Sequence, residues 1–326
     1  MTLAIHLCKN DHNVTVWEFD KAQVELLKKE RENKIFLPGI KLPDDLQVEN
    51  DIMPSVSGAE MIIFAVPSQV VRSTAEKVNE AVEDWNDIKA VVSVAKGLEL
   101  NTHKTMSTVI AEELNQGSND IICVLSGPSH AEEVSRDIPT AIVAASTSSR
   151  TSELVQDTFS SSYLRVYASD DVDGLEYGGS FKNTIAIAAG IVDGAGFGDN
   201  TKAALMTRAL VEITRLGVAM GAKEETFRGL AGMGDMIVTC LSKHSRNRHV
   251  GEEIGKGKSL EDVLENMSMV AEGVNTTKII KELSLEYNIE MPISEQVYNV
   301  LFENKKPEEA VLDLMTRDLK TELPNN

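Results

Sequence analysis

Residues 60–67 read EMIIFAVP, a continuous apolar run of the kind that forms a strand buried on both faces of a sheet. Similar runs follow at Ala90–Ala95 (AVVSVA), Ile121–Leu125 (IICVL) and Ala141–Ala145. Upstream, Val14–Phe19 (VTVWEF) is rich in residues that favour strands, and it follows a polar turn. These segments predict a sheet whose strands are spread over the first half of the chain.

Helix-like segments separate the predicted strands. They lie at Thr2–Leu7, Lys21–Glu32, Gln69–Val82 and Thr105–Leu114. Strands that alternate with helices are typical of a doubly wound α/β fold, because parallel neighbours need a crossover connection. We therefore predict a Rossmann-like, doubly wound parallel sheet in this part of the chain.

The pattern changes near residue 170. Beyond Leu175 we find no convincing strand, and segments with helical apolar spacing take over. The clearest of them are Lys202–Val218, Thr276–Tyr287 and Glu295–Phe302. A chain of 326 residues has the length of about two domains. We predict a dinucleotide-binding domain at residues 1–170 and an all-α domain for substrate binding and catalysis at residues 171–326.

Charge and cysteine usage exclude several classes of protein. The chain has 32 Lys and Arg residues against 51 Asp and Glu residues, a formal net charge of −19. This balance argues against binding to nucleic acid or anionic membranes, and an anionic small substrate would need cations supplied by its own site. Cys8, Cys123 and Cys240 fit neither a disulfide framework nor a zinc cluster. With no signal peptide and no apolar run approaching about 18 residues, we expect a cytoplasmic protein with no metal and no membrane insertion.

Gly178–Gly196 carries only two charges, Lys182 and Asp193, in an otherwise small or apolar segment. A helix this apolar is buried, so Lys182 is placed away from a fully solvated face. Burial lowers the pKa of a lysine, which suits the side chain to donate and accept a proton near neutrality. The alternative is a lysine whose ammonium group reaches the surface from a packed helix.

Two later segments also place polar residues either among glycines and apolar residues or directly before a helix. Asp235 lies among glycines and apolar residues in AGMGDMIVT (231–239), where an acid must be paired or must cap a helix. SRNR at 245–248 precedes a helix-like stretch, and Ser245 is a natural N-cap. Backbone N–H groups, a helix dipole, a guanidinium and an amide at one place suit a phosphate, and a solvated basic patch is the alternative.

Polar residues also follow the predicted strands, at the edge where open α/β sheets bind ligands. Lys96 follows AVVSVA and is placed for an anion, and the loop SGPSHA (126–131) follows IICVL. Simple polar turns are the alternative for both. Glu18, at the end of VTVWEF, can accept hydrogen bonds from the ribose hydroxyls of NAD and repel the 2′-phosphate of NADP, unless it is an ordinary surface acid.

Taken in order, these motifs resemble one family. They are AKGLE around Lys96, SGPSHAEE (126–133), YGGSFKNTIAI (177–187), AGMGDMIVTC (231–240), SRNR (245–248) and VAEGVNTTK (270–278), with FLPGIKLP (36–43) and VPS (66–68). Their order and spacing resemble the bacterial-type NAD(P)-dependent glycerol-3-phosphate dehydrogenase, from Thr2 to about Arg317. The resemblance implies interconversion of sn-glycerol 3-phosphate and dihydroxyacetone phosphate by hydride transfer with NAD(P)(H), which supplies glycerol 3-phosphate for phospholipid synthesis.

The resemblance also implies roles for individual residues. Lys182 is the general acid/base, oriented by Asp235 and Thr239, and Lys96 completes the catalytic set. The residues implied to bind substrate are Lys96, Gly127, Ser129, Asn183, Thr239, Ser245, Arg246 and Asn247, with Arg246 and Asn247 at the phosphate. The residues implied to bind the cofactor are Lys96, Ala131, Arg246, Val270 and Glu272, to which Glu18 is added. The family uses NAD or NADP, and Glu18 favours NAD.

The start of the chain departs from the family pattern. The family opens with a strand and a G-x-G-x-x-G loop whose N–H groups hold the cofactor pyrophosphate. Met1 stands just after the place of that loop, so we expect the dinucleotide-binding domain to be truncated at its N-terminus. We expect about 10–20 further upstream codons for a short strand and this loop. Without them we expect weak NADH binding and open strand edges.

Two other functions stay open on the sequence alone. A two-domain dehydrogenase that acts on a 3-hydroxy acid or its coenzyme A ester would not require SRNR. A non-catalytic remnant would keep a helical domain that binds a partner. No feature of the sequence fixes the oligomeric state, and a homodimer is one open arrangement.

Overall fold

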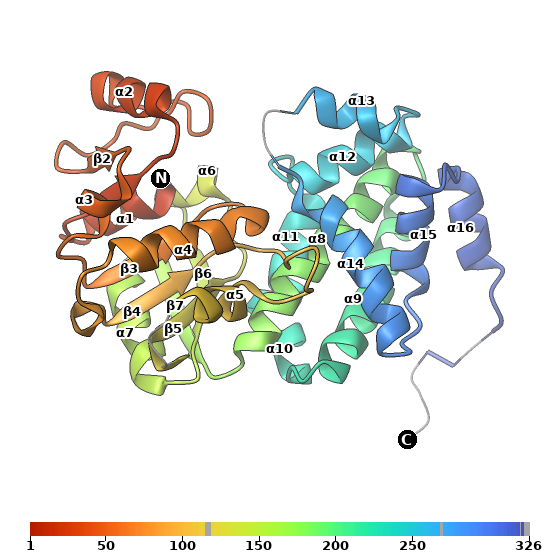
Figure 1. Ribbon diagram of the computed structural model, residues 1–326. Coiled ribbons are helices and arrows are strands. Elements are labelled where there is room, and N and C mark those ends of the chain that lie inside the picture. Colours follow the sequence, from red (N-terminus) through yellow and green to blue (C-terminus); the bar gives the residue numbers. More distant parts are fainter. Residues whose placement is uncertain (115–118, 268–269, 320, 323–326) are drawn as a thin grey trace. The chain divides into compact units, whose positions relative to one another are not determined.

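The computed structural model describes residues 1–326 except 115–118, 268–269, 320 and 323–326 (Figure 1). The chain divides into two compact units. Unit 1 consists of residues 1–180 and 217–238, and unit 2 consists of residues 181–216 and 239–326.

Unit 1 contains a five-stranded sheet with the order β3-β4-β5-β6-β7 and a two-stranded sheet of β1 and β2. The strands are β1 Thr15–Trp17, β2 Gln47–Glu49, β3 Met61–Phe64, β4 Ala90–Ser93, β5 Ile122–Ser126, β6 Thr140–Ala145 and β7 Leu164–Ser169. Neighbouring strands are parallel except β5 and β6, which are antiparallel. The predicted Rossmann-like fold is confirmed, with one antiparallel pair that the prediction of an all-parallel sheet did not include. β1 and β3 are edge strands of their sheets.

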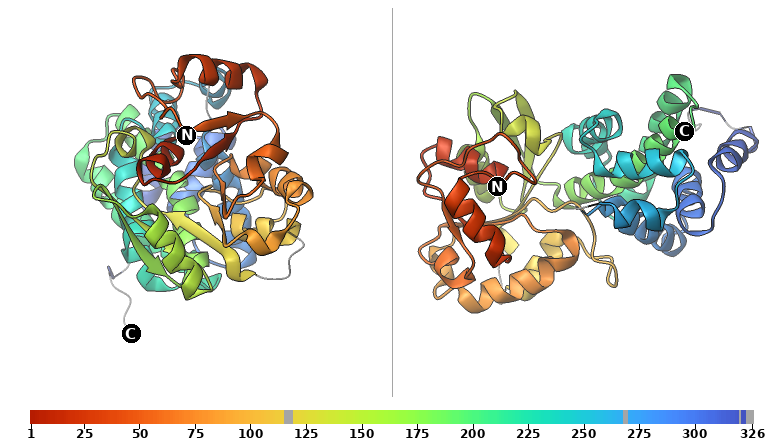
Figure 2. Two further views of the ribbon diagram at one scale, coloured as in Figure 1. Left: turned by 90° about the vertical axis from the view of Figure 1, so that its left-hand side faces the viewer. Right: turned by 90° about the horizontal axis from the view of Figure 1, so that it is seen from above.

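Helices cover both faces of the larger sheet (Figures 1 and 2). Successive side chains of a strand point to opposite faces, and β4 shows this directly. Val91 packs in the cluster of α4 (Val71–Ala81) and α5 (Met106–Glu113), while Ala90 and Val92 pack in the cluster of α1 (Thr2–Lys9) and α7 (Ser149–Phe159). Burial on both faces is what the continuous apolar runs of the sequence predict.

The predicted helices of the first half lie close to their predicted bounds. Lys21–Glu32 corresponds to α2 (Lys21–Glu30), which Asp20 caps by accepting a 2.9 Å hydrogen bond from Ala22 N. The helix stops at Arg31, whose φ of 51° is left-handed. The remaining short elements are α3 Ile52–Val56, α6 Ala131–Val134, α10 Glu224–Arg228, a π-helical segment Leu230–Gly234, and 3₁₀ turns at Ser68–Val70, Trp85–Asp87 and Asn119–Ile121.

Unit 2 is built from helices. Helix α8 (Val172–Gly194) and helix α11 (Asp235–Leu241) each begin in unit 1 and end in unit 2, while α9 (Asp199–Ala219) begins in unit 2 and ends in unit 1. The others are α12 Arg246–Gly255, α13 Leu260–Glu265, α14 Glu272–Glu286, α15 Pro292–Phe302 and α16 Pro307–Met315. Among the described residues after Ser169 there is no strand, which agrees with the sequence prediction of an all-α second half. None of the described helices combines the length and apolarity that a membrane span requires.

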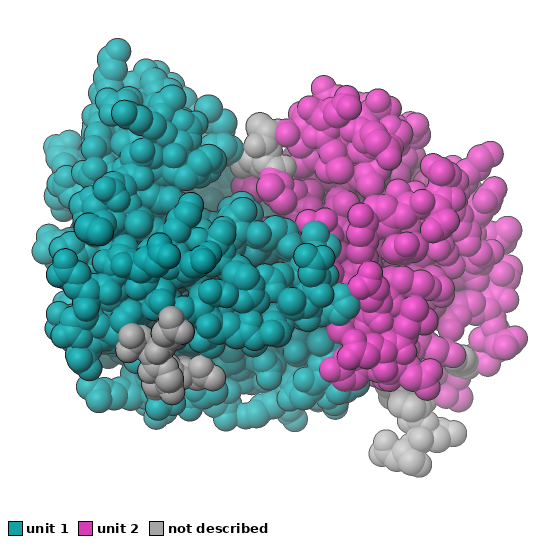
Figure 3. Space-filling view, in the orientation of Figure 1, with its two compact units in different colours: residues 1–180, 217–238 teal, residues 181–216, 239–326 magenta. Residues whose placement is uncertain are grey.

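The compact units differ from a division between residues 170 and 171 (Figure 3). The first segment of unit 1 continues beyond residue 170 into helix α8 as far as Ser180, and residues 217–238 also belong to unit 1. Compactness is a property of packing and need not follow chain order. The assignment of residues 1–170 and 171–326 to separate functions stays a prediction.

Candidate active site

Lys182 lies in the part of helix α8 that belongs to unit 2. It is 4% exposed, and its Nζ donates a 2.5 Å hydrogen bond to Oγ1 of Thr239 on α11. Thr239 is also buried. A charged ammonium removed from water needs polar partners, because an isolated buried charge is costly. The structure therefore holds Lys182 inside the unit, and its ammonium group does not reach out to the surface.

Asn183, the next residue, belongs to a second buried contact. Its backbone oxygen would stand 2.7 Å from a Cβ added to Gly273, the second residue of α14. The side chain of Asn247 lies at the same place, where its Oδ1 accepts a 2.9 Å hydrogen bond from Gly273 N. Glycine at position 273 therefore lets α14 begin directly against the backbone of Asn183 and the side chain of Asn247.

Helix α12 begins with the basic motif SRNR. Ser245 is the N-cap, and its Oγ accepts a 3.2 Å hydrogen bond from Arg248 N while its own O–H proton stays available for donation. Arg246, the first helical residue, is exposed, and Asn247 is buried. The helix dipole and the first-turn N–H groups attract an anion, and Arg246 adds a guanidinium. This helix start is suited to a phosphate group.

Helices α8 and α12 cross at very short range. Each contributes two glycines four residues apart, Gly190 and Gly194 on α8 and Gly251 and Gly255 on α12. A Cβ at any of the four would come within 1.9–2.5 Å of a backbone oxygen of the other helix. The crossing fixes the start of α12, with Arg246 and Asn247, relative to the segment of α8 that carries Lys182.

Gly251→Ala is expected to lower the free energy of unfolding by about 1–3 kcal/mol, the usual cost of overpacking. The new methyl group would stand 1.9 Å from the carbonyl oxygen of Ile187, so α12 would have to move away from α8. Urea unfolding measures the loss. Gly234→Ala is the control, because its nearest neighbours would be 3.7 Å away. Equal losses in the two variants would contradict the close crossing.

Another polar cluster lies in unit 1, around Lys96. Its Nζ donates to Oδ2 of Asp235 at 2.6 Å and to the carbonyl oxygen of Gly127 at 2.9 Å. Asp235 is 2% exposed, whereas the side chain of Lys96 is 25% exposed. The ion pair neutralises a carboxylate that has lost its water, and it leaves part of Lys96 accessible to a ligand.

The position of Asp235 depends on the glycine-rich segment before it. Asp235 is the first residue of α11 and follows the π-helical segment Leu230–Gly234. Gly232 is required there, since a Cβ would lie 2.2 Å from the oxygen of Phe227, and a Cβ at Gly178 would lie 2.8 Å from the oxygen of Ala231. Short π-helical segments occur frequently at functional sites. The sequence allowed Asp235 to be either a paired acid or a helix cap. In the structure it is paired with Lys96.

The loop after β5 requires its glycine. Gly127 has a φ of +140°, and a Cβ there would lie 3.0 Å from Cα of Ile142. Its carbonyl oxygen accepts from Nζ of Lys96 and, at 3.1 Å, from Oγ of Ser129. The loop therefore places Ser129 beside the oxygen that Lys96 binds. Ala131 is exposed at the start of α6.

Glu18 directly follows β1, at the carboxyl end of the strand. Its Oε1 accepts a 3.0 Å hydrogen bond from Asp20 N, and Asn50 Nδ2 donates to the carbonyl oxygens of Glu18 and Phe19 at 2.9 Å. The turn is thus fixed, and a carboxylate has further acceptor positions for ligand hydroxyls. An acidic group at a strand end fits the ribose of a dinucleotide.

The structure brings the predicted residues together in two groups. Unit 2 gathers Lys182 with Thr239 and Asn183 with Asn247, and Ser245 and Arg246 precede Asn247 on the chain. Unit 1 gathers Lys96, Asp235, Gly127 and Ser129. Near Gly273, Val270 is 48% exposed and Glu272 is half-buried as the first residue of α14. Glu18 and Ala131 also belong to unit 1.

Sequence reasoning missed two features of these groups. The ion pair of Lys96 and Asp235 joins residues 139 positions apart, and no local pattern signals it. The close approach at Gly273 has a weak signal, a glycine in the first turn of a predicted helix. The described residues contain no group of three or more His, Cys, Asp or Glu placed to bind a metal ion.

Comparison with known proteins covers nearly the whole chain. Residues 1–152 match the family described as NAD-dependent glycerol-3-phosphate dehydrogenase N-terminus, and residues 171–312 match the corresponding C-terminus family. A glycerol-3-phosphate dehydrogenase [NAD(P)+] of Thermoanaerobacter sp. (strain X514) is 54% identical, over 98% of this chain and 95% of the relative. One of Prosthecochloris aestuarii is 51% identical, over 99% of this chain and 96% of the relative.

A solved structure agrees with these relatives. The crystal structure of glycerol-3-phosphate dehydrogenase from Coxiella burnetii has a TM-score of 0.91 and 34% identity, and it covers 97% of this chain and 95% of that chain. Both halves of the chain therefore match the same kind of protein, in sequence and in fold. This chain belongs to the NAD-dependent glycerol-3-phosphate dehydrogenase family.

Proposed function

We propose that this protein interconverts sn-glycerol 3-phosphate and dihydroxyacetone phosphate with NAD(P)(H), and that Lys182 is its general acid/base. The observation that carries the proposal is the buried Lys182 ammonium, hydrogen-bonded to Thr239. In the direction of reduction, Lys182 donates a proton to the carbonyl oxygen at C2 of dihydroxyacetone phosphate. In the reverse direction it takes the proton from the C2 hydroxyl of glycerol 3-phosphate. Thr239 keeps Nζ in place for both steps.

The substrate phosphate needs cations in a chain of net charge −19. Arg246 supplies one at the start of α12, where the helix dipole and the amide of Asn247 add to the attraction. The hydroxyl of Ser245 donates to a phosphate oxygen. In unit 1, Lys96 binds substrate oxygens and Asp235 holds its ammonium group, with Gly127 and Ser129 shaping the loop beside it. Asn183 positions a substrate oxygen next to Lys182.

NAD(P) supplies or accepts the hydride at C2. Six residues of this chain are proposed to hold it: Glu18, Lys96, Ala131, Arg246, Val270 and Glu272. Glu18 accepts hydrogen bonds from the ribose hydroxyls of the adenosine half. In this proposal residues 1–170 serve mainly the dinucleotide, and residues 171–326 serve mainly the substrate.

NADH is expected to give a kcat/KM about tenfold or more above that of NADPH. Glu18 lies beside the ribose, and like charges brought together cost several kcal/mol, so the extra phosphate of NADPH is disfavoured. Initial rates with each cofactor measure the ratio. Glu18→Gln should lower the ratio of kcat/KM for NADH to that for NADPH. Glu25→Gln, a substitution at an exposed position on α2, should leave this ratio unchanged. A kcat/KM for NADPH equal to or above that for NADH would overturn this preference.

Substrate specificity separates the proposal from the other functions considered. The protein should oxidise glycerol 3-phosphate and not 3-hydroxy acids or their coenzyme A esters, because Arg246 and the start of α12 are proposed to recognise a phosphate on the carbon next to the reacting C2. Turnover of a 3-hydroxy acid alone would favour the rival dehydrogenase. A titration with NADH, followed by nicotinamide fluorescence, tests the non-catalytic alternative, which predicts no saturable binding.

We also propose a cellular location and an assembly for the protein. All three cysteines are buried, and burial raises the pKa of the Cys123 thiol to about 12, so this thiol stays protonated. Buried thiols fit the reducing conditions of a cytoplasm. A homodimer is proposed as the assembly, and sedimentation equilibrium measures it.

A further inference from the structure

The loop that carries Lys96 is held by side chains from helix α4 and from the 3₁₀ turn that precedes this helix. After β4 the chain passes through Lys96 and turns back on itself before α5. Glu99 N donates to the oxygen of Lys104 at 3.0 Å, and Leu98 forms an isolated antiparallel bridge with Thr105. Leu98 is 1% exposed, so this end of the loop is packed. The chain therefore forms a short closed loop between β4 and α5, and Lys96 lies near the beginning of this loop.

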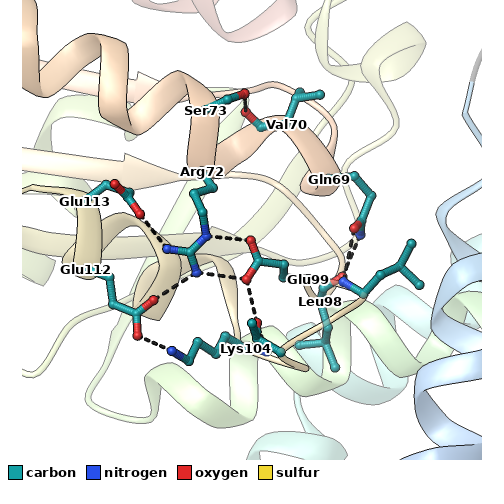
Figure 4. Close-up of polar contacts among 11 residues, drawn as sticks. Gln69, Val70, Arg72, Ser73, Leu98, Glu99, Lys104, Glu112 and Glu113 are labelled. Atoms are coloured by element: carbon teal, nitrogen blue, oxygen red, sulfur yellow. Dashed lines mark hydrogen bonds and ion pairs between the residues drawn. The ribbon is translucent and has the colours of Figure 1, made fainter.

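Gln69 binds the backbone of this loop on both sides of Glu99. Its Nε2 donates to the oxygen of Leu98 at 2.7 Å, and its Oε1 accepts from Leu100 N at 3.1 Å (Figure 4). One side-chain amide thus satisfies a backbone acceptor and a backbone donor, as a neighbouring strand would. Gln69 lies in the 3₁₀ turn that leads into α4.

Arg72 lies one helical turn after Gln69, and it binds the side chain of Glu99. Its Nε and Nη2 each lie 2.8 Å from an oxygen of Glu99, which is the paired geometry that a guanidinium and a carboxylate prefer. Nη1 and Nη2 also reach Glu113 at 2.5 Å and Glu112 at 2.9 Å, both on α5 (Figure 4). Lys104 in turn pairs with Glu112. Arg72 therefore ties the loop and α5 to α4.

The Arg72–Glu99 pair is the better shielded part of this network. The side chain of Glu99 is 17% exposed and that of Arg72 is 33% exposed. The guanidinium of Arg72 lowers the pKa of Glu99 to about 2, so the pair stays charged throughout the neutral range. Isolated surface ion pairs contribute little, but a two-pronged pair inside a network fixes geometry.

We propose that Gln69, Arg72 and Glu99 are positioning residues for Lys96. Gln69 binds the backbone of the loop and Arg72 binds its Glu99 side chain. Asp235 and Gly127 bind the ammonium group of Lys96 itself. A displacement of about 1 Å in a group that orients a substrate can cost on the order of 10²-fold in rate, so small movements of this loop matter. The inference rests on the proposed role of Lys96 in binding substrate oxygens.

Glu99→Gln is expected to raise KM for glycerol 3-phosphate and to lower kcat/KM about tenfold, with a much smaller change in the NADH dissociation constant. Glu113→Gln is the matched control. It breaks a bond of the same arginine, but one that leads to α5 and not to the loop. Both variants should lose similar thermal stability, and only Glu99→Gln should lose catalytic efficiency. Arg72→Lys should restore part of what Arg72→Gln loses.

A double-mutant cycle distinguishes this inference from the proposed function. Lys96→Ala alone tests the role of Lys96, and an unchanged kcat/KM there would remove that role. If Lys96→Ala is impaired, Glu99→Gln should cost little more in the Lys96→Ala background, because the loop then has no ammonium to place. A full tenfold additional loss in that background, or equal losses in Glu99→Gln and Glu113→Gln, would overturn the positioning role.

Discussion

Lys182→Ala is expected to lower kcat by about 10²–10⁴-fold, the usual contribution of a general acid/base. The variant removes the proton donor, while the residues proposed for the dinucleotide stay in place. The dissociation constant for NADH should therefore change far less than kcat. Stopped-flow measurement of NADH oxidation gives the rate of the reductive step, and fluorescence titration gives the binding constant.

The control for this variant is Lys202→Ala. Lys202 is a lysine of the same unit, and it is paired with Asp193 and only 14% exposed in its side chain. Its removal takes away a charge without taking away the proposed proton donor, so kcat should stay near that of the natural protein. If Lys182→Ala has a kcat close to that of the natural protein, Lys182 is not the general acid/base.

Arg246→Ala is expected to lower kcat/KM for glycerol 3-phosphate by roughly 10–100-fold. Hydrogen bonds to charged groups contribute about 1.5–3 kcal/mol each, and the phosphate would lose the guanidinium. Activity toward glycerol, which has no phosphate, should fall much less, so the ratio of kcat/KM for the two substrates reports the role directly. KM should rise more than kcat falls.

Lys256→Ala is the control for the loss of a positive charge. Lys256 follows the last residue of α12 and pairs with Glu252 and Glu253, so it lies at the other end of the same helix. The preference for glycerol 3-phosphate over glycerol should be unchanged in this variant. If Arg246→Ala keeps the natural preference, the phosphate is bound elsewhere.

Much of the fold could be predicted because its signals are local. Continuous apolar runs such as EMIIFAVP correspond to β3, and AVVSVA corresponds to β4, whose residues are all buried. β7 was missed, although Leu164 and Val166 are buried and Arg165 and Tyr167 are exposed. That alternation is the pattern of an edge strand, and it lies close to the change of pattern at residue 170.

Other elements have no local signal. β2 is three residues long with one buried side chain, Val48, so no period can be recognised in it. The antiparallel pairing of β5 with β6 depends on the path of the chain between them, which strand composition does not encode. The discontinuous units have the same origin, since residues 217–238 join unit 1 through contacts far along the chain.

The candidate site likewise has some features with a local sequence signal and others without one. The burial of Lys182 follows from the apolar segment around it, and the cap at Ser245 follows from its place before a helix. The pairing of Lys96 with Asp235 and the support of the Lys96 loop by Arg72 join distant segments, so only the structure provides them. Patterns within one helix or strand were accessible, and contacts between elements were not.

The most direct test of the proposed reaction follows the transferred atom. Dihydroxyacetone phosphate is incubated with the protein and with NADH that carries deuterium at the transferring position of the nicotinamide, and the product is analysed by mass spectrometry. We predict glycerol 3-phosphate with one deuterium at C2 from the natural protein, formed about 10²–10⁴-fold more slowly by Lys182→Ala. Product without deuterium at C2, or no glycerol 3-phosphate from natural protein that binds NADH, would contradict the account.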